Sequence, residues 1–171
     1  KKKRSGIAAY AATPCGAGRL RLSGCRDNYR VYDSVSEEKS AVFVTNAVSH
    51  ALRLTENGFR VILIGGELKA ATEAIVGNEA YVNLQKYNFT KGFFGTNGLN
   101  RTSGFTTPDI NEAMIKECAL KHTQKPYILC DSSKFLQTCP VSFGEFHSAR
   151  IITDRYPEES METEGHIIIA K

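Results

Sequence analysis

Two carboxylates and a lysine at helical spacing, preceded by two adjacent hydroxyl groups, could together bind a polar small molecule. Asp109, Glu112 and Lys116 follow Thr106 and Thr107 in the chain. Carboxylates accept hydrogen bonds from ligand hydroxyls, whereas hydroxyl groups and an ammonium donate to ligand oxygens. The same residue types also perform general acid–base catalysis. The pattern therefore predicts a site that either binds its ligand or transforms it.

Further candidate residues follow apolar runs that end in glycine or in a polar cluster. In open α/β sheets, ligands bind at the carboxyl ends of the strands. Glycine at such an end lets the backbone approach a ligand closely. The additional candidates at these positions are Glu67, Gly95, Asn97 and Lys134.

A helix is expected to begin directly after Asp109. Pro108 disfavours helical geometry at Thr107, and Asp109 is a residue type that caps helices. Apolar residues recur beyond it at roughly helical spacing, at 110, 113, 114 and 120. A purely structural alternative is open for these residues. Asp109 could be only a helix cap, and Glu112 and Lys116 could be only an exposed i,i+4 pair.

Strands and helices alternate along the chain. Apolar runs predict strands at residues 41–45, 60–64, 127–130, 149–153 and 166–169. Helical patterns occupy residues 70–86, the stretch after Asp109, and 46–54, where Asn46 is expected to cap the helix. Residues 104–109 are expected to form a loop. This alternation predicts an α/β fold, in which a layered, mostly parallel sheet is flanked by helices.

Composition fits one globular domain. The 171 residues are 42% hydrophobic and 23% charged, with a net charge of +4. Residues 1–33 hold 8 basic and 2 acidic residues, which leaves 14 basic and 16 acidic residues from 34 onward. Charge therefore gives no support for nucleic-acid binding by the larger part. We expect one domain over residues 34–171, preceded by an N-terminal segment, 1–33, in which 7–12 could form an alanine-rich helix.

Cysteine, histidine and hydrophobicity patterns predict neither a metal nor a membrane segment. The five cysteines, at 15, 25, 118, 130 and 139, show no disulfide framework and no paired metal spacing. The histidines, at 50, 122, 147 and 166, are scattered without metal-ligand spacing. No long apolar run or signal-peptide pattern is present. We expect a cytoplasmic protein with reduced thiols, no cofactor and no membrane partner.

An ordered set of motifs resembles the C-terminal effector-binding domain of the DeoR family of bacterial transcription repressors. The motifs are Val-Thr-Asn at 44–46, Ile-Gly-Gly-Glu at 64–67, Gly-Thr-Asn-Gly at 95–98, Gly-Phe-Thr-Thr-Pro-Asp at 104–109, Asn-Glu-Ala at 111–113 and Asp-Ser-Ser-Lys-Phe at 131–135. The resemblance implies a phosphorylated-sugar effector, a homo-oligomer, and DNA binding through a helix-turn-helix expected before Lys1. It also implies a fold similar to ribose-5-phosphate isomerase A and glucosamine-6-phosphate deaminase.

These two enzymes supply the alternative function. As an isomerase or deaminase, the chain would use Asp109 or Glu112 as general base, and Lys116 or Lys134 would stabilise an enediolate. The ordered motifs resemble the repressors more than the enzymes, so the sequence favours a sensor that binds without turnover.

Residues 14–33 depart from the family. The resemblance implies a helix, a strand and an Asp-Ala-Gly-Thr-Thr phosphate loop in the N-terminal segment, but 14–33 has no clear period. When codons for 14–33 are reread from the second base, the allowed products include Leu-Val-Glu-Pro-Gly-Asp-Phe-Val-Tyr-Leu-Asp-Ala-Gly-Thr-Thr-Thr-Glu-Phe-Met-Ile. We therefore hypothesise a local frameshift, from a sequence error or a real lesion. As written, the segment lacks the phosphate loop.

Overall fold

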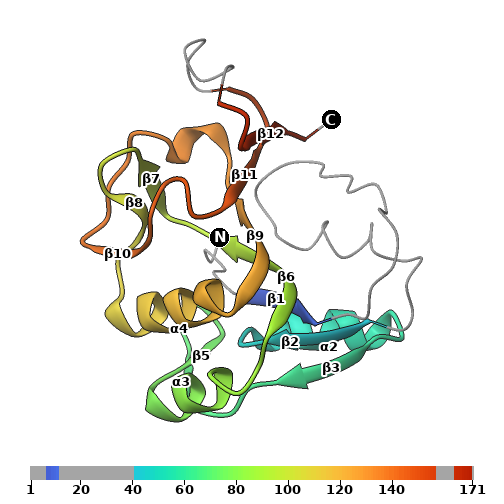
Figure 1. Cartoon of the computed structure of the whole chain (residues 1–171). Helices are drawn as coiled ribbons and strands as arrows, with labels where there is room; N and C mark the ends of the chain where they lie inside the picture. Colours follow the sequence, from blue (N-terminus) through green and yellow to red (C-terminus); the bar gives the residue numbers. More distant parts are fainter. Residues whose placement is uncertain (1–6, 12–40, 157–163, 171) are drawn as a thin grey trace.

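A seven-stranded sheet runs through the middle of the molecule (Figure 1). The computed structural model describes residues 7–11, 41–156 and 164–170. The strands lie in the order β12-β11-β9-β6-β1-β2-β3. Their bounds are β1 Ile7–Ala11, β2 Val42–Thr45, β3 Arg60–Leu63, β6 Phe89–Gly95, β9 Thr123–Leu129, β11 Arg150–Thr153 and β12 Ile167–Ile169.

Most neighbouring strands of this sheet are parallel. Four of its six pairs are parallel, namely β2·β3, β6·β9, β9·β11 and β11·β12. The two antiparallel pairs both involve β1, which lies between β6 and β2. The predicted α/β fold with a mostly parallel sheet is therefore confirmed.

The prediction of an alanine-rich helix at 7–12 is wrong, because Ile7–Ala11 forms the strand β1. Alanine favours a helix, but so short a segment cannot form a stable one alone. Backbone pairing with strands on both sides outweighs that intrinsic preference. Residues 14–33, and with them the frameshift hypothesis, lie outside the described residues.

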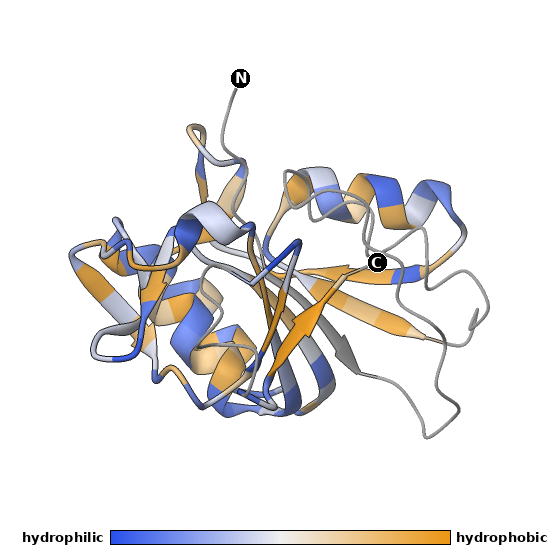
Figure 2. Cartoon of the chain, turned by 90° about the horizontal axis from the view of Figure 1, so that it is seen from above, coloured by the Kyte–Doolittle hydropathy of each residue, from blue (hydrophilic) through white to orange (hydrophobic). Residues whose placement is uncertain are grey.

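Helices cover both faces of the sheet (Figures 1 and 2). Helix α2 (Val48–Glu56) packs through Leu54 against Phe43 and Phe59 on one face. Because side chains alternate along a strand, Val44 points to the other face. There it joins the core that is formed with helices α3 (Asn78–Leu84) and α4 (Ile110–Lys121). None of the helices in the described ranges is both long and apolar enough to span a bilayer.

Smaller β-elements connect the sheet to these helices. A hairpin joins β4 (Glu67–Lys69) to β5 (Ala74–Val76), and a three-stranded sheet joins β10, β8 and β7 in that order. The bounds of the latter are β7 Gly98–Asn100, β8 Gly104–Thr107 and β10 Val141–Gly144.

Two predictions made for these stretches are wrong. The helical pattern at 70–86 is interrupted by β5, and helix α3 begins only after Gly77, whose φ is +96°. All three residues of β5 are buried, whereas a helix with one face toward solvent would expose some of three consecutive residues. The expected loop at 104–109 is largely strand β8, because its residues pair on both sides with β7 and β10.

The prediction that Asn46 caps α2 is wrong. The N-cap is Ala47, without a side-chain hydrogen bond. Asn46 is buried and its Nδ2 donates to the carbonyl of Ile75, 3.1 Å away. The amide side chain therefore ties the end of β2 to β5 rather than starting the helix.

Candidate functional site

The carboxyl ends of six strands lie at one edge of the sheet. Strands β2 and β3 are parallel, as are β6 and β9, and β1 runs antiparallel to both β2 and β6. The chain therefore leaves β3, β6 and β9 on the same side, just before Glu67, Asn97 and Lys134 respectively. As predicted, these candidates follow strand ends at the edge where α/β proteins bind ligands.

Asp109 is the N-cap of α4, as the sequence predicted. Its Oδ1 accepts a hydrogen bond from the backbone N–H of Glu112, at 2.9 Å. Its Oδ2 lies 2.9 Å from the Nζ of Lys69. The hydrogen bond from Lys69, followed by that from the Glu112 amide, lowers the pKa of Asp109, so the carboxylate stays ionised at neutral pH. Asp109 is therefore both a cap and a member of a charged cluster.

Lys69 joins this cluster from the β4–β5 hairpin. Its Nζ lies 3.0 Å from Glu112 Oε1, which also accepts from the hydroxyl of Thr72 at 3.1 Å. Burial opposes the charge of Lys69, but the hydrogen bonds to Asp109 and Glu112 outweigh it and raise its pKa. The side chains of Lys69 and Asp109 are 30% and 29% exposed, so the cluster is open to solvent on this side.

Glu112 and Lys116 form a buried pair. Their side chains are only 5% and 2% exposed, and Lys116 Nζ lies 3.9 Å from Glu112 Oε2. The alternative of an exposed surface pair is therefore wrong. The predicted apolar stripe is correct only in part, because Ala113 and Leu120 are buried, whereas Ile110 and Met114 are exposed. The helix is turned so that Glu112 and Lys116 face inward, whereas Glu117 and Lys121 form an exposed pair.

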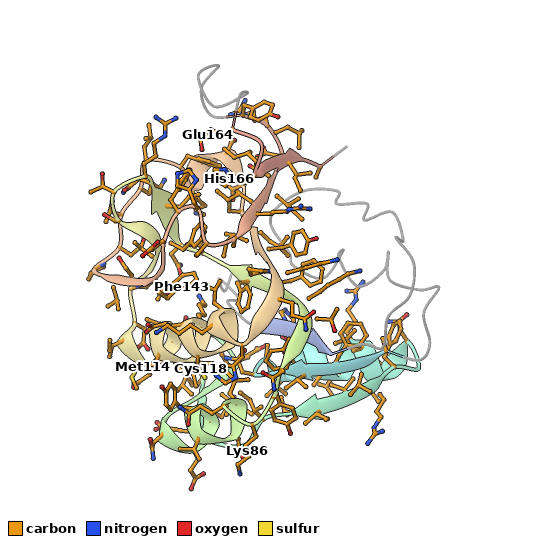
Figure 3. All side chains as sticks on the ribbon, viewed as in Figure 1. Lys86, Met114, Cys118, Phe143, Glu164 and His166 are labelled. Carbon is orange, nitrogen blue, oxygen red and sulfur yellow. The ribbon has the colours of Figure 1, made fainter. Side chains whose placement is uncertain are left out.

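The ammonium of Lys116 has an unusual environment. It lies 5.2 Å from the centre of the Phe143 ring, on β10, and makes no hydrogen bond within the described residues. Figure 3 shows Phe143 above helix α4. Burial lowers the pKa of Lys116 to about 8, although the charge of Glu112 acts in the opposite direction. Lys116 is thus a buried cation that has no acceptor among the described residues.

The hydroxyl residues of β8 are buried and hydrogen-bonded within the protein. Thr106 Oγ1 donates to the carbonyl of Gly98 at 2.9 Å and accepts from the amide of Cys139 at 3.0 Å. Thr107 Oγ1 donates to Asn97 Oδ1 at 3.0 Å. The hydroxyl of Thr106 therefore holds β8 to its neighbours, whereas Thr107 orients Asn97 beside the carboxyl end of β6, which is Gly95.

Glu67 and Lys134 lie near this edge without entering the cluster's hydrogen bonds. Glu67 is exposed on β4, and it shares a strand face with Lys69 because the two are separated by one residue. Lys134 ends the 3₁₀ helix η1 (Ser132–Lys134), and within the described chain its ammonium has no ion pair. The amide of Ser132 donates to Asp154 at 2.6 Å, which holds η1 beside the end of β11.

Two cluster members, Lys69 and Thr72, are absent from the sequence-based candidates. The helical interpretation of 70–86 concealed the hairpin that carries them. The available signal was the Gly-Gly turn at 65–66 after β3, followed by Glu67 and Lys69 at strand spacing.

Comparison with known proteins gives a consistent result. The family profile described as "DeoR C terminal sensor domain" matches residues 2–155. The uncharacterised HTH-type transcriptional regulator FruR of Bacillus subtilis is 37% identical over 137 residues, or 75% of this chain and 55% of that protein.

Two further relatives are similar over a smaller part of the chain. The HTH-type transcriptional regulator GlpR of Haloferax volcanii is 35% identical, over 70% of this chain and 48% of its own length. The lactose phosphotransferase system repressor of Staphylococcus aureus is 36% identical, over 61% of this chain and 42% of its own length. The chain spans about half the length of these relatives.

Proposed function

The chain belongs to the DeoR family as its C-terminal sensor domain, and we propose that it binds a phosphorylated sugar without turnover. The effector-binding domain comprises residues 34–171 together with strand β1, which pairs with β2 and β6, and it acts in the cytoplasm as part of a homo-oligomer. Effector binding shifts a two-state equilibrium that a helix-turn-helix domain outside this chain transmits to DNA. The name of the lactose phosphotransferase system repressor pairs repression with a sugar, which supports a sugar-derived effector.

The observation that carries the proposal is the buried ammonium of Lys116. Its only charged neighbour within 4.0 Å in the described chain is Glu112, at 3.9 Å, and it has no hydrogen-bond acceptor. A buried charged donor without an acceptor is costly, so a ligand oxygen that reaches it gains a strong charge-assisted hydrogen bond. Lys116 therefore favours a ligand that carries oxyanions or several oxygen atoms.

The neighbouring groups suit the remainder of such a ligand. Asp109, Glu112 and Glu67 accept hydrogen bonds from sugar hydroxyls, and Lys69 is close enough to bind the same oxygens. Gly95 has no side chain, which lets a ligand approach the backbone at the carboxyl end of β6. Asn97, which Thr107 orients through its hydroxyl, and Lys134 donate to the phosphate or to sugar oxygens from the ends of β6 and β9. Thr106 holds β8 in place. Each group is thus assigned by its residue type and its position at the sheet edge.

A thermal-shift screen of a chain in which the family-like strand and phosphate loop are restored at residues 14–33 tests the binding proposal. Phosphorylated sugars are compared with the free sugars and with inorganic phosphate, so that the contribution of each part is separated. A ligand at 100 times its dissociation constant adds about 2.7 kcal/mol to the free energy of unfolding. Lys116→Met should abolish this increment, whereas Lys121→Met, an exposed lysine of the same helix, should retain it. Equal responses of both variants would contradict the assignment.

A turnover assay separates the sensor from an enzyme. A lysine whose pKa is about 8, next to carboxylates, is also suited to acid–base chemistry. We expect sugar phosphates to remain unchanged after prolonged incubation, as followed by NMR. Aldose–ketose conversion or ammonia release that disappears in Asp109→Asn would instead identify an isomerase or a deaminase.

A further inference from the structure

A second group of polar side chains lies outside the Lys69–Lys116 cluster. His147 follows β10, while Glu164 and His166 immediately precede β12. One ligand atom from each of these three residues lies within 4.8 Å of the other two. In Figure 3, Glu164 and His166 lie well away from Met114 of helix α4. The sequence predicted no metal site, because these residues show no metal-ligand spacing along the chain.

Two atoms of this group are buried without a hydrogen bond. Glu164 Oε2 and His166 Nε2 have no partner within the described part of the chain. Glu164 Oε2 lies 3.5 Å from His166 Nδ1. A buried polar atom left unsatisfied costs about 1–3 kcal/mol. We therefore expect these two atoms to face a group that binds their lone pairs, such as a metal ion or a hydrogen-bond donor.

The surroundings hold the carboxylate and the imidazole in position. Arg101 donates to Glu164 Oε1 from Nε at 2.9 Å and from Nη2 at 2.5 Å, which leaves Oε2 facing His166. The Phe146 ring contacts both imidazoles edge-on, with centroids 5.1 Å away.

Backbone hydrogen bonds also fix this turn. The amide of Ile151 donates to the carbonyl of His166, and the amide of Ile167 donates to that of Glu164. Such outer contacts are typical of ligands that are oriented before a metal binds.

We propose that His147, Glu164 and His166 form a binding site for a divalent transition-metal ion, with zinc as its most suitable occupant. Two imidazole nitrogens and one carboxylate oxygen suit zinc, whereas magnesium and calcium prefer oxygen ligands alone. Three protein ligands leave a fourth position for water.

The geometry needs only a small adjustment. With bonds of about 2.0–2.2 Å in a tetrahedral arrangement, ligand atoms lie roughly 3.3–3.5 Å apart. Separations of up to 4.8 Å therefore have to close by up to about 1.5 Å. His147 is exposed and can rotate toward the other two. A bound ion would tie the turn after β10 to the segment that enters β12.

Titration of the metal-free 171-residue chain with zinc chloride tests this site. Competition with a chromogenic chelator, in a reductant that does not bind zinc, should give one ion per chain. Both His147→Ala and His166→Gln should weaken zinc binding by more than about tenfold, since even outer-shell changes cost that much. Because His147 is exposed, its variant should keep the fold, which circular dichroism verifies.

Controls separate this site from other ligands of zinc. His122→Gln and Cys139→Ser should bind zinc like the parent chain, because neither residue belongs to the group. Cobalt substitution should give visible absorption without a sulfur-to-cobalt charge-transfer band. No stoichiometric zinc binding, equal binding by His147→Ala, or a thiolate band would each overturn the proposal. None of these outcomes depends on the effector site.

Discussion

Replacement of Lys116 by methionine should make the protein more stable at neutral pH while it abolishes effector binding. Methionine is close to lysine in length and has no charge to bury. In the native protein, the Lys116 side chain is 2% exposed and its pKa is lowered from 10.5 to about 8 by burial. A difference of one pKa unit corresponds to about 1.36 kcal/mol, so burial of this cation costs about 3 kcal/mol. Removal of the charge removes that cost.

The sign of the pH dependence follows from proton linkage. Between pH 8 and 10.5 the unfolded chain binds more protons at Lys116 than the folded chain does. The free energy of unfolding of the native protein therefore rises with pH in this window, and below pH 8 the full penalty remains. From pH 7 to 9.5 the two pKa values predict a gain of about 2 kcal/mol from this group. The methionine variant lacks this gain.

Urea denaturation followed by circular dichroism provides the measurement. The difference between parent and Lys116→Met is taken at each pH, because titrations of other groups then cancel. We expect a difference that favours the variant at pH 7 and shrinks by about 2 kcal/mol toward pH 9.5. Lys121→Met is the matched control, since Lys121 is exposed and pairs with Glu117 on the same helix. Its difference from the parent should stay nearly constant.

Parallel stability curves for the parent and Lys116→Met would refute this reasoning. They would mean that Lys116 keeps an ordinary pKa in solution, which requires access to water or an additional acceptor. In that case the ammonium would no longer support an oxygen-rich ligand, and the proposed effector site would lose its main argument.

Three other predictions address separate parts of the protein. Lys134→Ala should weaken effector binding in calorimetry and barely change the melting temperature; lower stability with unchanged affinity would make this lysine structural. Gly104→Ala should destabilise the protein by at least about 1–3 kcal/mol in urea denaturation, because φ is +64° and the added Cβ would lie 2.1 Å from the carbonyl oxygen of Gly144; unchanged stability would contradict the described turn. For residues 14–33, the chain as written should bind phosphorylated effector poorly, and intact mass together with resequenced DNA distinguishes its causes. A mass that fits the shifted reading would mean that the sequence of 14–33 as written is in error. Micromolar binding by the chain as written would instead contradict our account of the phosphate loop.

The sequence predicted those parts of the fold in which local pattern and tertiary environment agree. The strands predicted at residues 41–45 and 127–130 coincide with β2 and with the end of β9, except at residues 41 and 130. Asp109 caps its helix because the stretch from Pro108 excludes an earlier start. Where the two levels disagreed, the prediction failed. Residues 74–76 continue a helical pattern, yet pairing with β4 makes them a strand.

The residue types of the site could be predicted from the sequence, but the contacts between their side chains could not. Carboxylates and a lysine at helical spacing indicated polar-ligand chemistry without showing which partners they meet. Lys69 reaches Asp109 and Glu112, which lie 40 and 43 positions further along the chain, through a hairpin that the pattern did not reveal. Such a contact depends on how two elements pack, which no local spacing encodes.

The sequence alone determined the family, the alternation of strands and helices, and the residue types at the carboxyl edge of the sheet. Tertiary structure alone decided the state of Glu112 and Lys116, because an i,i+4 pair looks the same on a buried and an exposed helix face. The packing of α4 against Phe143 buries both charges and lowers the pKa of Lys116. The tertiary structure likewise brought His147, Glu164 and His166 within reach of one another. Burial and proximity depend on the whole fold, so they become visible only once every element has its place.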